Sequence, residues 1–148
     1  MRAFNHEGIT YALTMPGYFS RSVDGLSAFE EGPQLFGNAM RHSAVWCHDG
    51  VLDVLWTRVG DAPESILWSQ IELGGPWTEW HQGPETTFLR PELEWEGATE
   101  PVTPSQRSAV YQRVNQLRDP AIFVDDDRCY LFYAGGGESA IGVAELIV

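Results

Sequence analysis

The chain has 148 residues, of which 43% are hydrophobic and 12% aromatic, so it can form a packed core and is not a disordered segment. Its formal net charge of -12 repels phosphate backbones, which argues against a nucleic-acid partner. An acidic surface that keeps the protein in solution is the commoner reason for such a charge, and a site built from carboxylates is the other reading.

Residues 1–10 contain no basic segment followed by an apolar one, so no secretory signal is visible and a cytoplasmic location is favoured. No apolar run is long enough to span a membrane, so no membrane partner is expected. Cys47 and Cys129 have neither metal-ligand spacing nor the density of a disulfide scaffold, and both fall in expected strands. We expect buried free thiols, and no cofactor or metal is implied.

The first expected strands are Ile9–Thr14 and Tyr18–Ser22, followed by a turn at Asp24-Gly25. They match the second and third strands of a unit that recurs later in the chain. The first strand of this copy has no visible counterpart. We therefore interpret residues 1–40 as an incomplete unit and infer that residues upstream are missing.

The second copy occupies residues 41–90. Strands are expected at 41–46, 54–56 and 66–73, with a tight turn at His48-Asp49-Gly50. A fourth strand is expected at Thr78–His81. Residues 91–116 then form a long connection rich in Pro and Glu, in which Ser105–Gln116 could hold a short helical turn.

The third copy, residues 117–148, aligns with the second at an offset of 77 residues. Arg118–Phe123 falls on Arg41–Trp46, and Leu131-Phe132-Tyr133 falls on Val54-Leu55-Trp56. After a three-residue insertion in the second copy, Glu138 meets Glu64. This copy lacks a fourth strand.

Each copy is a strand meander, and radial repetition of four-stranded antiparallel units is typical of a β-propeller. The fold class expected is therefore all-β, a partial propeller domain over residues 1–148 with two to three blades. A sandwich or barrel is the alternative, because a meander alone does not determine how the sheets close. Isolated blades leave strand edges bare, so self-association through these edges is expected.

The segment Asn115–Phe123, which contains Arg118-Asp119-Pro120, and the following Asp126–Gly135 resemble the blade start of five-bladed propeller glycoside hydrolases of the family-43 and family-32 type. The ending Ile141–Leu146 and the earlier stretch Gly25–Phe36 also resemble that group. The resemblance covers most of the chain at the level of blades. It implies a five-bladed propeller and a carbohydrate substrate or ligand.

Alternate turns of a meander lie at opposite ends of the sheet, so the starts of the first strands share an end with the turns between strands two and three. This rule places eight polar residues near one face: Arg41, His42, Arg58, Asp61, Glu64, Arg118, Asp119 and Glu138.

Glycoside hydrolysis uses two carboxylates, and the resembled enzymes take three acidic residues from successive blades. By motif, Asp119 matches the residue that tunes the acid and orients the sugar. Its alternative role is to tie the blade start to Arg118 or to backbone amides. Glu96 is our candidate for the general acid; the alternative is that it is only a solvated carboxylate of the loop. Three other carboxylates of the connection compete with it for the role: Glu92, Glu94 and Glu100. No counterpart of the base is found.

His42 occupies the repeat position of Asp119, where it could bind a sugar hydroxyl, act as an acid or base, or support the next blade. The other candidate substrate-binding residues are Arg41, Arg58, Arg118, Glu138 and Trp95. The leading expectation is a glycosidase-like carbohydrate-active enzyme that is incomplete in this chain. A non-catalytic propeller that binds sugar or protein, and an inactive fragment, are the alternatives.

Overall fold

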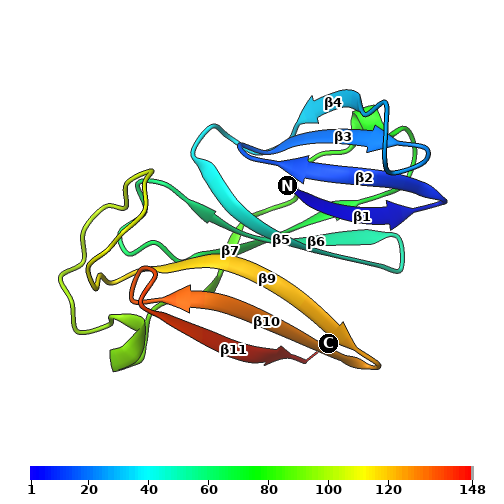
Figure 1. The fold of residues 1–148 in the computed structure, drawn as a ribbon. Coiled ribbons are helices and arrows are strands. Elements are labelled where there is room, and N and C mark those ends of the chain that lie inside the picture. The colour runs from blue at the N-terminus through cyan, green and yellow to red at the C-terminus, as the bar shows by residue number, and fades with distance from the viewer. Residues whose placement is uncertain (148) are drawn as a thin grey trace.

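The computed structural model describes residues 1–147 as eleven strands in three antiparallel sheets, with two short 3-10 helices (Figure 1). The all-β class expected from the sequence is confirmed. Among the described residues, no helix is long and apolar enough to cross a membrane.

The first sheet contains β1 (Arg2–His6), β2 (Ile9–Thr14), β3 (Tyr18–Ser22) and β4 (Glu30–Gln34), in that order. β1 pairs with β2 along its whole length. The prediction that this copy lacks its first strand is therefore wrong. The pattern was missed because β1 is short and places only Phe4 in the core.

The second sheet contains β5 (Met40–His48), β6 (Val51–Arg58), β7 (Ile66–Glu72) and β8 (Thr86–Leu89). The prediction of a fourth strand at residues 78–81 is wrong, because a 3-10 helix spans Trp77–Glu79 and the fourth strand is β8. Trp77 and Trp80 are both buried in the core. A turn with about three residues per repeat brings both indoles to one side, which a strand would not do.

The third sheet contains β9 (Leu117–Asp125), β10 (Arg128–Gly135) and β11 (Ala140–Leu146). The connection before it holds a 3-10 helix at Glu94–Glu96, and residues 105–116 form no helix, contrary to the prediction. Several of their backbone groups bond outside the segment. The amide of Ser105 donates to the carbonyl of Asp61, and that of Val114 donates to the carbonyl of Gly136.

The second sheet lies between the other two and buries both of its faces (Figure 1). On β6, Leu52 and Val54 pack into a cluster with the first sheet, whereas Leu55 packs with Leu117 and Leu131 of the third. Both faces of the central sheet are therefore apolar. Of the two free cysteines, Cys129 is buried as expected and Cys47 is only partly buried.

The first strands of the three sheets are neighbours, because β5 contacts both β1 and β9. One side chain joins all three. The Arg2 guanidinium donates to the carbonyl of Ser43 on β5 at 2.5 Å and to that of Pro120 on β9 at 3.3 Å. Residues at the starts of these strands are thereby brought together.

Candidate functional site

Bulges interrupt β5 and β9 at equivalent points of the repeat. The register of β5 on β6 shifts between Met40 and Ser43, and that of β9 on β10 shifts opposite the step from Phe132 to Ala134. The irregular residues are thus Arg41-His42 in one sheet and Asp119-Pro120 in the other. A bulge changes the direction of a side chain, and bulges are common next to active sites.

Asp119 has an unusual backbone conformation. Its φ of 50° lies in the left-handed region, although the residue is not glycine and is followed by Pro120. Aspartate is among the residues that tolerate this region, but a following proline disfavours helical values. Strain of this kind concentrates at functional sites, and here it places one carboxylate at the bulge.

The Asp119 carboxylate meets His42, its counterpart in the repeat. The Nδ1 atom of His42 lies 2.5 Å from Oδ1 of Asp119, and the side chains are 31% and 44% exposed. Partial burial works to raise the pKa of Asp119, but the hydrogen bond and charge of His42, together with the charges of Arg41 and Arg118, hold it below its ordinary value. Asp119 is therefore an ionised, solvent-accessible acceptor.

A buried ion network lies beside this pair. Nη1 of Arg41 and Nε of Arg118 each lie 3.4 Å from the same atom, Oε2 of Glu64. All three side chains are at least 95% buried. Nη1 of Arg118 also lies 3.2 Å from Oε1 of Glu138, which is about one-third exposed. Buried charges are tolerated only when they are paired, so these contacts hold the second and third sheets in one arrangement.

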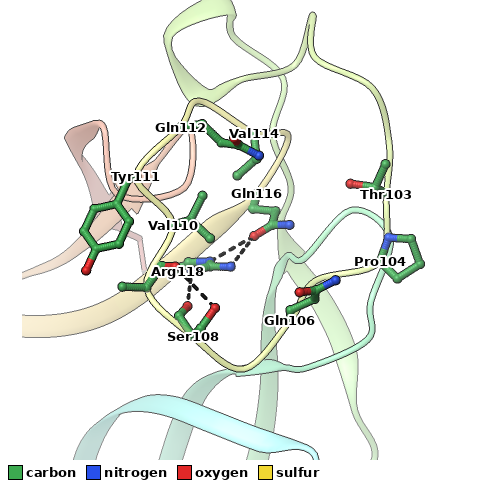
Figure 2. A pocket seen from close by; sticks show the side chains of 11 residues that line it. Thr103, Pro104, Gln106, Ser108, Val110, Tyr111, Gln112, Val114, Gln116 and Arg118 are labelled. Atoms are coloured by element: carbon green, nitrogen blue, oxygen red, sulfur yellow. Dashed lines mark hydrogen bonds between the residues drawn. The ribbon is translucent and has the colours of Figure 1, made fainter.

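The arginines also bind the long connection. Arg118 donates through Nε and Nη2 to Oε1 of Gln116, and through Nη1 to the carbonyl of Ser108 at 3.1 Å (Figure 2). Arg41 donates to the carbonyl of Gln106 at 3.0 Å. The connection is thereby fixed over the starts of β5 and β9.

Not all of the predicted site residues belong to this cluster. Arg58 pairs at the surface with Asp61 at 2.9 Å and with Glu85 at 2.7 Å. Trp95 stacks on Tyr133 with ring centroids 6.0 Å apart, and is 38% exposed. No contact of either side chain reaches Asp119 among the described residues.

Glu96, the candidate acid, is only 2% exposed. Its Oε2 accepts hydrogen bonds from the backbone amides of Glu92 and Leu93, and its Oε1 accepts one from the hydroxyl of Tyr133 at 2.7 Å. Burial first, and then the hydrogen bond and charge of Glu96, raise the pKa of Tyr133 above its ordinary value. These contacts favour a structural role for Glu96 in the connection, and its catalytic role stays a prediction.

Gln116 was not singled out from the sequence, although it lies at the centre of the Arg118 contacts. A polar residue two positions before a buried arginine on a strand is the available signal, because residues i and i+2 share a face. Among the described residues, no group of three or more His, Cys, Asp or Glu side chains is arranged to hold a metal ion.

Comparison with known proteins gives one relative and no family. The chain is similar to an uncharacterized protein of Acanthamoeba polyphaga mimivirus, with 37% identity over 162 aligned residues that cover 99% of this chain. The chain spans about half the length of that relative, 46% of it. No family model and no solved structure matches the sequence.

Proposed function

We propose that the three sheets are successive blades of a β-propeller and that the chain is part of a carbohydrate-active protein of the glycosidase type. The face-to-face packing of the sheets and the adjacent first strands β1, β5 and β9 support the propeller. The resemblance of Arg118-Asp119-Pro120 to the blade start of propeller glycoside hydrolases supports the activity.

The observation that carries this proposal is the His42–Asp119 pair. An ionised carboxylate that is 44% exposed, in a left-handed backbone and beside two buried arginines, can accept hydrogen bonds from sugar hydroxyls. Its negative charge would also raise the pKa of a nearby acid, which is the role that the resemblance gives to Asp119. His42 orients this carboxylate.

A second candidate function is a sugar-binding propeller without catalysis. It is favoured by the contacts of Glu96, since a general acid must reach the glycosidic oxygen and this carboxylate is buried and fully engaged. The two functions differ in whether a second essential carboxylate exists.

The test is an assay of the chain on a panel of aryl glycosides, with ligand-observed NMR for binding of the same compounds. If the chain is a glycosidase, Asp119→Asn should lower kcat/KM by about tenfold to a hundredfold, because it removes a charged hydrogen-bond acceptor for the sugar and the charge that raises the pKa of the acid. Asp127→Asn, in the exposed turn between β9 and β10, is the matched control and should leave kcat/KM unchanged.

If a compound binds without being cleaved, and Asp119→Asn weakens its binding, the sugar-binding function is supported and the enzymatic one is refuted. If turnover and binding occur and neither responds to Asp119→Asn, the assignment of Asp119 is wrong. If no compound of the panel binds or is cleaved, both functions are refuted for this chain.

A further inference from the structure

The long connection lines an open hollow of about 510 Å³ (Figure 2). Residues 103–114 form one side of it, and Gln116, the last residue of the connection, and Arg118 of β9 lie at its base. Its size falls within the range of small-molecule sites.

Gln116 presents an unused donor to this hollow. The residue is only 4% exposed, and its Oε1 accepts from Nε and Nη2 of Arg118, which determines the orientation of the amide. Its Nε2 is then left with two N–H donors, and it makes no hydrogen bond to any residue that the structure describes. Because Nε2 has no partner and yet is not one of the fully buried unpaired atoms, its N–H groups are open to the hollow, where a ligand or water can receive them.

Other neutral polar groups surround the same space. Three more polar side chains line it (Figure 2); they are exposed, and their amide or hydroxyl groups form no hydrogen bond within the described part of the chain: Thr103, Gln106 and Gln112. Val110 and Val114 add apolar wall between them. A pocket with both donors and acceptors and some apolar wall fits a ligand that has hydroxyl groups on an aliphatic ring.

The charge of the pocket argues against an anion. Arg118 is its one charged lining residue, and that guanidinium is paired with Glu64 and Glu138. All three of its nitrogens also donate to Gln116 or to Ser108. A phosphate or carboxylate entering the pocket would therefore find no free positive charge to offset its desolvation.

We propose that this hollow is a binding pocket for a neutral sugar unit, with Gln116 as the donor at its base and Gln112 as a second contact. The proposal rests on the proposed carbohydrate function and adds the substrate class, which is neutral and not anionic, and the place of binding.

The experiment is saturation-transfer NMR on the chain with two sets of probes. The neutral set contains the methyl glycosides of glucose, galactose, xylose and arabinose, and the anionic set contains glucuronic acid and glucose 6-phosphate. At least one neutral probe should bind, and neither anionic probe should. Equal binding of both sets, or binding of none, would overturn the proposal.

Two variants locate the site. Gln116→Glu keeps an acceptor for Arg118 but removes the two donors, and Gln112→Ala removes an exposed amide and should not affect folding. Each should weaken binding of the neutral probe about tenfold, the equivalent of roughly one hydrogen bond. Gln70→Ala, an exposed glutamine on β7, is the control and should bind normally. Unchanged affinity in Gln112→Ala together with a folded, fully binding Gln116→Glu contradicts the pocket.

The outcomes separate this inference from the proposed function. If Asp119→Asn loses turnover and the glutamine variants bind normally, the glycosidase proposal is supported and the pocket is refuted. If binding depends on Gln116 and no aryl glycoside is cleaved, the pocket is supported and the glycosidase proposal is refuted.

Discussion

At the scale of single residues, the lowered pKa of Asp119 predicts how the unfolding free energy depends on pH. Its pKa in the folded protein is held below the ordinary value of 3.8, chiefly by His42 against the opposing effect of burial. The unfolded chain therefore binds a proton at a higher pH than the folded one. The stabilisation is complete above the ordinary value and is lost as the pH falls through the lowered one.

Asp119→Asn should remove this contribution. Asparagine also tolerates the left-handed backbone, so the substitution changes the charge and not the backbone preference. The variant should have a lower Tm than the native chain at about pH 6, and the two Tm values should converge as the pH falls below 3.8 and through the lowered pKa. Thermal unfolding across this range checks it, with Asp127→Asn as control. A constant difference in Tm at all pH values would contradict the linkage.

Glu64 gives a second prediction at this scale. Its carboxylate, fully buried, lies between Arg41 and Arg118. Glu64→Gln leaves these guanidinium groups undercompensated, and breaking a buried pair costs about 3 kcal/mol or more of unfolding free energy. Glu85→Gln removes a carboxylate that is 42% exposed and pairs with Arg58, for a cost below about 1 kcal/mol. Urea unfolding of both variants makes the comparison, and equal losses would refute it.

At the scale of elements, the 3-10 helix Glu94–Glu96 depends on one buried carboxylate. Glu96→Ala would leave two backbone amides and the Tyr133 hydroxyl without their acceptor, which should lower the unfolding free energy by about 2 kcal/mol or more. Glu96→Gln can keep the three bonds, because its amide oxygen can accept from the backbone and its NH₂ can donate to Tyr133.

A structural role therefore predicts a folded Glu96→Gln with near-native stability and near-native turnover, measured by urea unfolding and by the aryl glycoside assay. A catalytic acid would instead lose turnover in this variant while remaining folded. The Ala and Gln variants thus separate the two roles of Glu96.

Sequence reasoning succeeded where strands are long and regular. β5, β6 and β9, β10 were predicted because apolar residues recur in the same order in both copies and turn residues separate them. β1, β4 and β8 were missed because each places few side chains in a core, so burial leaves little pattern in the sequence. Edge strands are defined by backbone pairing, which composition does not record.

The site was predictable to the extent that hairpin geometry determines it. The rule of alternate turns correctly brought Arg41, Glu64, Arg118 and Glu138 to one end of the sheets, where they form one network. The burial of Glu96 could not be foreseen, because it depends on how the long connection packs against Tyr133. Gln116 was missed for the same reason, since its pocket is lined by residues of that connection.

At the scale of the whole molecule, the sheets differ in how their faces are covered. The central sheet is apolar on both faces and packed on both. The third sheet packs Leu131 and Tyr133 against it but leaves an apolar stripe on the opposite face. Phe132, Ile141 and Val143 form this stripe and are 38%, 82% and 57% exposed.

These three side chains lie on one face, because Phe132 is directly opposite Val143 and Ile141 is opposite Ala134 in the ladder of β10 and β11. Exposed apolar faces of this kind mark interaction surfaces. We expect the chain, studied alone, to associate through this stripe with rising concentration, whereas the sequence led us to expect association through strand edges. Phe132→Lys with Val143→Lys should shift it toward the monomer in sedimentation velocity, since two charges would have to be buried.

Thr87→Lys is the control, because it adds a charge to the exposed edge strand β8 and leaves the stripe intact. If association occurs through the stripe, this variant should sediment as the native chain does. If Thr87→Lys instead produces the monomer and the double variant does not, the strand edge is the contact. That result would assign self-association to backbone pairing, as in exposed edges generally, and not to packing of sheet faces.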